Sequence, residues 1–226
     1  MRRAPIVLAA LAAVLALSAC GGPTPGSTFE PEPTDSVAAT PTPDPAPPRL
    51  EELVLTTEGL GTLAFGTVAD SDPVTRMIYL DPEACVFDGG PASGDPEAAN
   101  WVPIDAYGTP GDQTFGVNVQ PDGTVDRVDL YNGTIPTDRG LRVGDSRADA
   151  LAAYPDAEIS HEWATDLLVV PGTAGNIHIE IAHNTGDAVG YWQPDQVDRV
   201  LFVRGVVASF PSFTVAGSDN IAGGCL

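Results

Sequence analysis

Apolar positions from Glu51 onward recur in short runs with the two-residue period of β-strands. Every second residue is apolar in 115–119 and in 177–182, so one side of each strand is expected to face a core and the other to be polar. A Pro-Asp-Gly sequence at 121–123 follows the first segment and predicts a tight hairpin turn. Further apolar runs of this kind occupy 53–55, 125–131, 167–170 and 200–203. The pattern predicts a mostly antiparallel β-sheet.

Two short helices are expected beside this sheet. The segment 147–154 follows Ser146, a good N-terminal cap, and Asp149 suits the positive end of a helix that a proline then ends. A second helix is predicted over 73–79, with Asp72 as its cap and a proline in its first turn. The fold class expected is therefore α+β, mostly antiparallel sheet with two short helices.

The two halves of the folded region resemble each other. The sequence Val-Asp-Arg-Val occurs at 125–128 and again at 197–200, 72 residues later. We interpret this as a tandem duplication of one helix-plus-strands unit. The units are residues 51–136 and 137–226, and they are expected to share one globular body with a continuous sheet of about eight strands.

The first twenty residues have the pattern of an export signal. A basic head precedes an apolar run over 4–17, which is too short to span a bilayer as a helix. The sequence Leu-Ser-Ala-Cys at 17–20 resembles the lipobox of bacterial lipoproteins. That resemblance implies that residues 1–19 are a signal peptide and that Cys20 is lipidated and becomes the first mature residue. The alternative is an ordinary secretory signal with a chance cysteine.

Residues 20–50 are predicted to be a lipidated, Pro/Thr-rich disordered tether. Nine of the thirty residues from Gly21 to Leu50 are proline, and Phe29 is the only aromatic residue there. Proline can neither continue a helix nor donate to a sheet, and so polar a composition cannot bury enough apolar surface to offset the entropy of the chain. The segment is expected to hold the folded body away from the membrane.

Two family resemblances follow from these motifs. A short apolar run ending in glycine, then a capping residue and a helix, occurs at 58–67 and 138–145. With the strands that follow, it resembles the repeat of β-lactamase-inhibitor-like proteins and of the small outer-membrane assembly lipoproteins, over residues 53–207. The lipobox, spacer and duplicated unit together are similar to uncharacterised lipoproteins of high-GC Gram-positive (actinobacterial) bacteria. Only the scaffold is implied, and no inhibitor contact residue is carried over.

Composition and charge exclude several kinds of function. The chain has 31 acidic and ten basic residues, and all ten basic residues are arginine. A formal charge of −21 argues against nucleic-acid binding and against electrostatic docking on anionic lipid. The absence of lysine excludes a P-loop lysine and a Schiff-base lysine.

Cys85 and Cys225 remain after lipidation of Cys20. Two cysteines outside the cytoplasm pair more often than they react, so we predict a disulfide, with free thiols or metal ligands as the alternatives. Such a bridge would tie the C-terminus to the first half of the body.

The histidines, His161, His178 and His183, form none of the strong metal-binding spacings such as His-Glu-x-x-His. His178 and Glu180 share one face of the predicted strand 177–182, while His183 falls on the other face if the strand continues. We interpret the pair as the solvent-facing polar side of a half-buried strand. The sequence therefore predicts no metal site, no cofactor and no catalytic residue.

Tyr191 and Trp192 lie in a predicted loop and are the candidate binding aromatics. Exposed aromatic side chains anchor interfaces, and the alternative is that this pair folds back as a lid over the sheet edge. The leading hypothesis is a non-catalytic binding or interaction module, held by its lipid on the extracytoplasmic face of the cell membrane. Its partner would be an envelope protein or a small ligand. The alternatives are a cell-envelope hydrolase and an inhibitor of a secreted enzyme.

Overall fold

The computed structural model describes residues 46–109 and 111–225. The predicted signal peptide 1–19, the lipidation site Cys20 and the predicted tether up to residue 45 lie outside the described residues. The main sheet consists of β6 (Phe115–Val119), β7 (Val125–Leu130), β8 (Glu158–His161), β9 (Thr165–Pro171), β10 (Gly175–Ala182) and β11 (Val200–Val207). Two small sheets consist of β1 (Leu55–Thr56), β2 (Gly59–Leu60) and β3 (Leu63–Ala64), and of β4 (Ile78–Asp81) and β5 (Asn100–Pro103). The helices are α1 (Arg147–Ala153) and α2 (Val215–Ser218), with 3-10 turns η1 (Leu50–Glu52), η2 (Pro96–Ala98), η3 (Asp105–Tyr107) and η4 (Gly186–Ala188).

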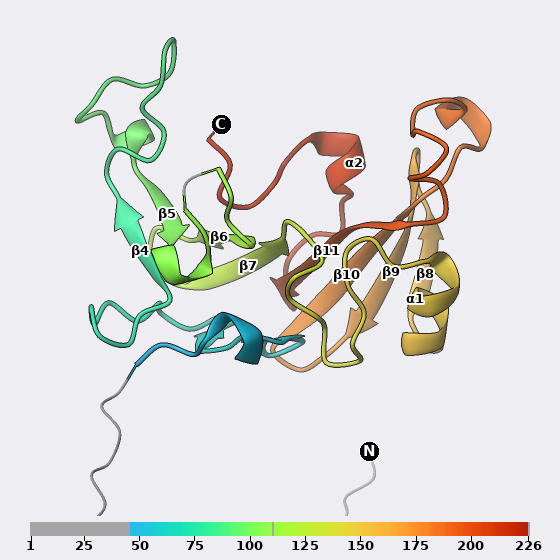
Figure 1. Cartoon of the computed structure of the whole chain (residues 1–226), viewed down its shortest axis with the longest axis horizontal. Helices are drawn as coiled ribbons and strands as arrows, with labels where there is room; N and C mark the ends of the chain where they lie inside the picture. Colours follow the sequence, from blue (N-terminus) through green and yellow to red (C-terminus); the bar gives the residue numbers. More distant parts are fainter. Residues whose placement is uncertain (1–45, 110, 226) are drawn as a thin grey trace, which may run out of the picture. The chain divides into compact units, whose positions relative to one another are not determined.

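The main sheet has the strand order β6-β7-β11-β10-β9-β8, and every neighbouring pair is antiparallel. The predicted mostly antiparallel α+β fold is therefore confirmed. The expected continuous sheet of about eight strands is wrong, because this sheet has six strands and β1–β3 form a separate sheet. Leu55, Leu60 and Leu63 of β1–β3 are all buried, so these short strands cover a face of the main sheet instead of extending its edge (Figure 1).

The hydrophobic core lies between β1–β3, α1 and one face of the main sheet. Strand β10 contributes Ile177, Ile179 and Ile181 to this face, as its alternating pattern predicts. Phe65, directly after β3, packs where a side chain on Gly205 of β11 would be only 2.4 Å from its ring. Glycine at this position therefore permits the close contact between the small sheet and the main sheet.

One of the two predicted helices is confirmed and the other is wrong. Helix α1 is capped by the Ser146 hydroxyl, which accepts from the Asp149 amide, while the Asp149 carboxylate accepts from the Ser146 amide. The segment 73–79 makes only a single turn, in which the Arg76 amide donates to the Asp72 carbonyl. The chain then becomes β4 and pairs with β5, because burial of Ile78 in the core prevails over local capping. Helix α2 was not predicted.

The opposite face of the main sheet carries charged side chains, yet it is covered. The C-terminal segment 208–225, drawn in red in Figure 1, crosses it. His178 and Glu180 lie on this face with relative exposures of 1% and 0%. Their interpretation as a solvent-facing polar side is therefore wrong, because the C-terminal segment covers this face; its hydrogen bonds replace water at Glu180, whereas the His178 ring nitrogens have no hydrogen-bond partner among the described residues.

Backbone groups of the C-terminal segment meet these charges directly. The Glu180 carboxylate accepts from the Val215 amide at 2.5 Å and from the Ala216 amide at 3.2 Å. It also pairs with Arg204 at 3.0 Å. Arg204 donates in turn to the Phe213 carbonyl, and its guanidinium lies 4.7 Å from the centre of the Phe213 ring. Each member of the buried ion pair thus has a hydrogen-bond partner in the C-terminal segment, while Nε and Nη1 of Arg204 have none among the described residues.

A second buried ion pair lies on β7. Arg127 pairs with Asp129 and donates to the Asn220 side chain at 2.9 Å. The Asp129 carboxylate accepts from the Ala222 amide at 2.9 Å, and the Tyr131 hydroxyl donates to the Ala222 carbonyl at 2.5 Å. The C-terminal segment is therefore held at both ion pairs.

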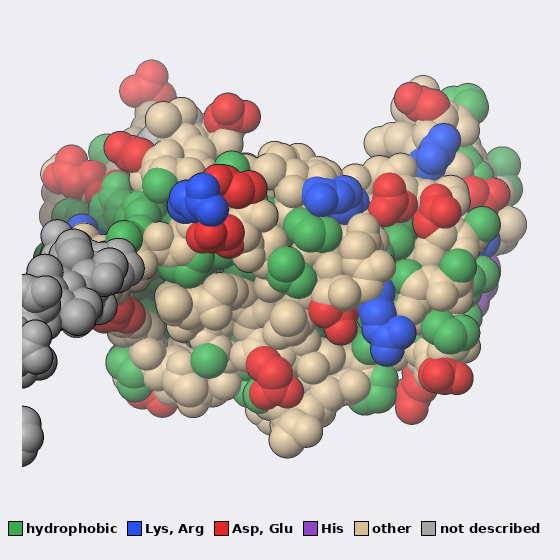
Figure 2. All heavy atoms as spheres, turned by 60° about the horizontal axis from the view of Figure 1, so that its bottom comes forward, with side chains coloured by type: hydrophobic (Ala, Val, Ile, Leu, Met, Phe, Trp, Pro, Cys, Tyr) green, Lys and Arg blue, Asp and Glu red, His purple; other side chains and the backbone are tan. Residues whose placement is uncertain are grey.

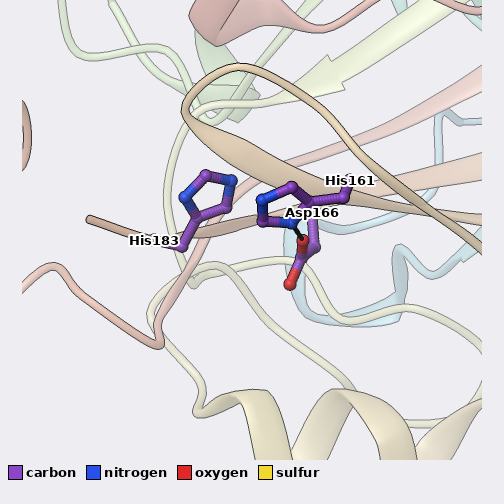
Figure 3. A group of neighbouring side chains, drawn as sticks. All are labelled: His161, Asp166 and His183. Carbon is purple, nitrogen blue, oxygen red and sulfur yellow. Dashed lines mark hydrogen bonds and ion pairs between the residues drawn. The ribbon is translucent and has the colours of Figure 1, made fainter. Parts of the chain in front are cut away.

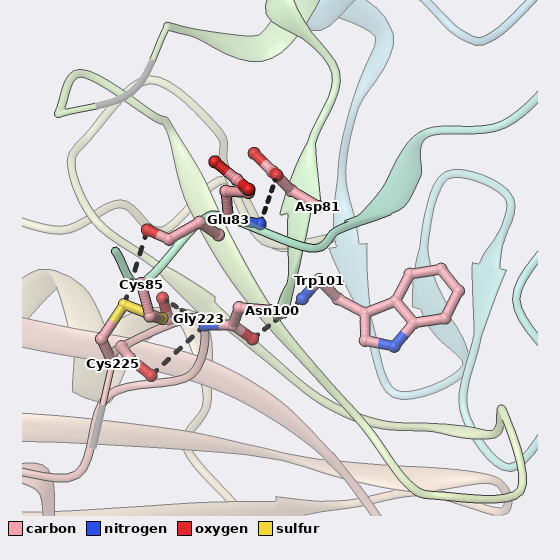
Figure 4. Close-up of a disulfide and its surroundings, with 9 residues drawn as sticks. Asp81, Glu83, Cys85, Asn100, Trp101, Gly223 and Cys225 are labelled. Carbon is pink, nitrogen blue, oxygen red and sulfur yellow. Dashed lines mark hydrogen bonds between the residues drawn. A yellow bond between two sulfur atoms is a disulfide. The ribbon is translucent and has the colours of Figure 1, made fainter. Parts of the chain in front are cut away.

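Cys85 and Cys225 form a disulfide, with their Cα atoms 5.5 Å apart (Figure 4). The Asn100 side-chain amide donates beside it to the carbonyls of Gly223 and Gly224, at 3.1 and 3.3 Å. These contacts fix the end of the C-terminal segment next to β5.

The face of the body that Figure 2 shows is mostly polar, and most of its charged side chains are acidic. Figure 2 brings the bottom of Figure 1 forward and shows acidic side chains spread across this face, with hydrophobic ones in small separate groups. Within residues 46–109 and 111–225, no helix combines the length and apolar character needed to cross a bilayer.

Removing the disulfide is expected to destabilise the body. Replacing both Cys85 and Cys225 with serine opens a loop of 140 residues, and we expect the free energy of unfolding to fall by about 3–5 kcal/mol. Denaturant titration measures the change. Reductant should lower the stability of the wild type to the same level and leave the double variant unaffected. A wild-type protein whose stability does not respond to reductant would contradict the prediction.

Acid is expected to destabilise the body through His178. Burial, with repulsion from Arg204 and Arg127, lowers the pKa of His178 from its usual 6.5 to about 4. The unfolded ring takes up a proton at a higher pH than the folded ring, so stability falls as the pH drops from about 6.5 to about 4, by on the order of 3 kcal/mol.

The variant His178→Phe isolates this effect, since it removes the titrating group and two ring nitrogens that have no hydrogen-bond partner among the described residues. Its stability, measured by denaturant titration between pH 7 and pH 4, should fall less steeply than that of the wild type. Parallel curves for the two proteins would show that His178 does not carry the acid response.

Candidate functional site at the tip of the β8–β9 hairpin

A compact group of imidazole, carboxylate and aromatic side chains lies where the β8–β9 hairpin turns and where β10 ends. We call this group the tip site. It belongs to one edge of the main sheet, because β8 is the last strand in the order. Its members are His161, Trp163, Asp166, His183, Thr185, Tyr191 and Trp192.

Hydrogen bonds to the turn of the hairpin hold the tip site in place. The Glu162 amide donates to the Thr165 carbonyl at 2.9 Å and closes the turn. The Ala164 carbonyl accepts from the His183 amide at 3.1 Å and from the Trp192 indole N–H at 2.6 Å. The loop after β10 is therefore attached to the hairpin at one carbonyl.

The loop is also closed on itself. The Asn184 side chain donates to the Trp192 carbonyl at 3.0 Å and accepts from the Trp192 amide at 3.1 Å. One side chain thus satisfies both backbone groups of Trp192, and a loop with only one 3-10 turn, η4, keeps a defined conformation.

Three aromatic rings form one side of the tip site. Trp163 and Tyr191 meet edge to face with ring centres 4.7 Å apart, and Tyr191 meets Trp192 at the same distance. Trp163 is 49% exposed and Tyr191 is 44% exposed. Trp192 is half-buried in a small cluster with Phe202 and three alanines. Trp192 thus anchors the loop to the body, and Trp163 and Tyr191 present aromatic surface to solvent.

His161, Asp166 and His183 form the other side of the tip site (Figure 3). His161 and Asp166 are direct cross-strand partners on β8 and β9, and His183 follows directly after β10. The His161 Nδ1 lies 2.6 Å from Asp166 Oδ1. The two imidazole rings stack with centres 4.2 Å apart and planes 12° from parallel. One potential ligand atom from each residue lies within 4.8 Å of the others.

Neighbouring charged groups determine the charge state of Asp166. Arg147 of α1 pairs with Asp166 and, at 2.6 Å, with Asp198. Burial tends to raise the pKa of Asp166, but hydrogen bonds from His161 and Arg147 outweigh it and leave that pKa below its usual value. Asp166 is therefore a carboxylate at neutral pH.

The arrangement Asp166–His161–Thr185 has the order of a catalytic triad, but its geometry does not favour hydrolysis. The Thr185 hydroxyl lies 3.4 Å from His161 Nε2 and only 3.0 Å from His183 Nδ1, so two imidazoles share it. The His161 side chain is 65% exposed, whereas a general base works best in a site that excludes water. The tip site therefore offers groups for binding a cation or a partner.

The structure keeps the two candidate aromatics in contact but gives them different exposure, and it groups other residues that lie apart in the sequence. Of the candidate aromatics, Tyr191 is exposed as an interface anchor would be, while Trp192 folds back onto the body. Trp163, Asp166 and the grouping of His161 with His183 were not predicted from the sequence. The reason is that all residues of β8 are exposed, so this strand lacks the apolar alternation by which strands are predicted.

An apolar cavity of about 280 Å³ lies between β7, β11 and the C-terminal segment, and one of its lining residues, Phe202, packs against Trp192 of the tip site. Leu130, Phe202, Val215 and Ile221 line it, together with Asp129 and Arg204, whose charges are paired. No histidine lines this cavity. It therefore lacks the combination of imidazole and carboxylate groups that the hydrolase alternative requires.

Comparisons with known proteins leave the function to be argued from the site itself. No protein-family model matches the sequence, and no curated protein matches it. Among solved structures, the chain is similar to the crystal structure of the uncharacterized protein yfeY from Escherichia coli, with 14% sequence identity and a TM-score of 0.40. The similarity covers 68% of this chain and 99% of that chain.

Proposed function

We propose that this chain is a lipoprotein anchored by Cys20 to the extracytoplasmic face of the cell membrane, of the uncharacterised type found in high-GC Gram-positive bacteria. In this proposal residues 1–19 are a signal peptide and residues 20–50 are a disordered tether. The folded body is a non-catalytic binding module, and its partner is a protein of the cell envelope. The observation that carries the binding role is the contact between two exposed aromatic rings, Trp163 in the turn of the β8–β9 hairpin and Tyr191 in the loop after β10.

The exposure of the tip site favours a protein partner over a small ligand. Small-molecule sites are concave and enclose most of the ligand, whereas residues 158–163 are all exposed. Tryptophan and tyrosine are the side chains that most often anchor protein interfaces. Because acidic residues outnumber basic ones by 31 to ten, we expect the partner surface to be neutral or basic.

The position of the tip site suits a tethered protein. The Tyr107 hydroxyl donates to the Pro48 carbonyl at 2.7 Å, and the Tyr107 ring packs against Phe115 of β6. The chain therefore joins the body near β6, and the tip site lies at the opposite edge of the sheet, on β8 and β9 (Figure 1). A membrane anchor before Pro48 would leave the tip site free to meet a partner.

We also propose that the body arose from two tandem helix-plus-strands units, 51–136 and 137–226, resembling the repeat of β-lactamase-inhibitor-like proteins. The hairpins β6–β7 and β10–β11 support this origin, because each lies in a different unit and their second strands pair with each other. The shared Val-Asp-Arg-Val sequence opens β7 and leads into β11. Among the described residues, the first unit has no α-helix equivalent to α1.

Replacing Cys20 with serine is expected to release the protein from the membrane. Without the thiol there is no thioether to the diacylglyceryl group, and the apolar energy of two acyl chains is lost. Detergent phase partition and intact-mass analysis of protein from the native host measure the effect. A Cys85→Ser, Cys225→Ser double variant should still partition into detergent. A wild-type chain that enters the aqueous phase or retains residues 1–19 would contradict the lipid anchor.

Removing the exposed aromatic pair is expected to abolish partner binding. We expect the yield of crosslinked partner to be at least tenfold lower in a Trp163→Ala, Tyr191→Ala double variant than in the wild type, because anchor residues each contribute about 2 kcal/mol or more to binding. A photo-crosslinking residue at position 189, an exposed valine in the same loop, reports contact in intact cells. Mass spectrometry identifies the product.

Phe87→Ala is the matched control, since Phe87 is also an exposed aromatic residue but lies outside the tip site. Crosslinking that survives in the double variant, or falls equally in the control, would contradict the proposed surface. Turnover of a substrate by the purified protein would instead support the hydrolase alternative.

A further inference from the structure

The hydrogen bonds of the tip site determine which ring nitrogens are free. A carboxylate accepts but does not donate, so the neutral His161 ring carries its hydrogen on Nδ1, 2.6 Å from Asp166 Oδ1. Its Nε2 lone pair then faces outward, 3.4 Å from the Thr185 hydroxyl. This ring is mostly exposed and can turn about its side-chain bonds.

His183 has the opposite tautomer. Its Nε2 lies 3.0 Å from the Glu162 carbonyl, which can only accept, so Nε2 carries the hydrogen. The Nδ1 lone pair faces the Thr185 hydroxyl at 3.0 Å and the Thr185 amide at 3.4 Å. The Thr185 hydroxyl has one hydrogen, so it can donate to only one of the two imidazoles. In the ion-free protein, two nitrogen lone pairs are thus directed at the Thr185 hydroxyl.

The groups behind these three side chains resemble the outer partners of a metal site. Metal-binding histidines usually donate their second N–H to a carbonyl or carboxylate, and the Glu162 carbonyl has this role for His183. Arg147 bonds to Asp166 Oδ2 and leaves Oδ1 facing His161. The ligand set is therefore held from outside by two different elements, the hairpin turn and α1.

We propose that His161, Asp166 and His183 bind one divalent transition-metal ion of the Zn²⁺ class. Two nitrogens and one carboxylate oxygen are donors that suit Zn²⁺, Co²⁺ or Ni²⁺, whereas Ca²⁺ and Mg²⁺ prefer oxygen donors alone. Ligands of a tetrahedral ion lie roughly 3–3.5 Å apart for bonds of about 2 Å, and the three ligand atoms already lie within 4.8 Å of one another. Because Asp166 Oδ1 lies at His161 Nδ1, a ligand set that includes Asp166 uses this nitrogen. The ion then takes the place of the hydrogen on Nδ1, the neutral ring carries its hydrogen on Nε2 beside the Thr185 hydroxyl, and water completes the coordination.

The charges around the site permit a cation. Arg147 is the nearest positive group, and Asp198 neutralises it at 2.6 Å. Glu162 adds an exposed carboxylate in the hairpin turn, hydrogen-bonded to the Ser160 hydroxyl at 2.7 Å. The ion would join the ends of β8, β9 and β10, on the side of the tip site away from the exposed aromatic rings.

Isothermal titration of the metal-stripped full chain with ZnCl₂ tests the proposal, using protein without a histidine tag. We expect one ion per chain, no binding of Ca²⁺ or Mg²⁺, and at least 30-fold weaker affinity in His161→Ala. The variant Asp166→Asn should also weaken binding. Because the His161 side chain is exposed, its removal is not expected to affect folding. Titration with Co²⁺ gives a second readout, since tetrahedral coordination intensifies its visible absorption.

Glu162→Gln is the matched control, because it removes a neighbouring carboxylate that is not a proposed ligand and keeps the backbone carbonyl that holds His183. It should retain the affinity of the wild type within about threefold. Equal affinity in His161→Ala and wild type, an equal loss in Glu162→Gln, or the absence of an intensified Co²⁺ spectrum would each overturn the proposal. The outcome is independent of whether the aromatic pair binds a partner.

Discussion

The burial of charge on one face of the main sheet is the constraint on which the rest of the structure depends. Strands β10 and β11 bring Glu180 and Arg204 together with almost no exposure to water. Removing one partner of a buried pair costs several kcal/mol, and hydrogen bonds from neighbouring groups offset part of the cost of burying such charges. The C-terminal segment supplies two amides to Glu180 and the Phe213 carbonyl to Arg204. These hydrogen bonds hold the segment across the sheet, and the disulfide at Cys225 fixes its end.

Covering both faces of the main sheet leaves its two edges as the open parts of the sheet. The small sheet β1–β3 and α1 cover one face, and the C-terminal segment covers the other. Of the two edge strands, β6 lies near the point where the described chain begins, and β8 lies at the far edge. Edge strands and the loops beside them are the parts of a sheet that remain open to other molecules. The imidazole, carboxylate and aromatic groups of the tip site gather at this far edge.

The sequence predicted those elements whose conformation depends on neighbouring residues in the chain. The alternation in 177–182, the cap at Ser146 and the Pro-Asp-Gly turn each specify their own conformation, and each agrees with the structure. The helix over 73–79 failed because packing of Ile78 and pairing with β5 prevailed over its cap. The error at His178 and Glu180 has a different cause: alternation shows that two side chains share a face but not what covers it. The tip site was missed because its residues come from β8, the turn after it, β9 and the loop after β10, and β8 has no apolar pattern.

The tip site couples its two sides through one backbone carbonyl. The Ala164 carbonyl accepts both the His183 amide and the Trp192 indole, so any change in the His183 backbone on ion binding would act on the bond that positions the aromatic side. Linkage makes such coupling reciprocal: an ion that strengthens partner binding at Trp163 and Tyr191 must itself be bound more tightly by the complex, by the same factor. Asn184 limits the size of this effect, because it holds Trp192 through two hydrogen bonds of its own. The strength of the coupling therefore depends on how much of the Trp192 position is set by Ala164 and how much by Asn184.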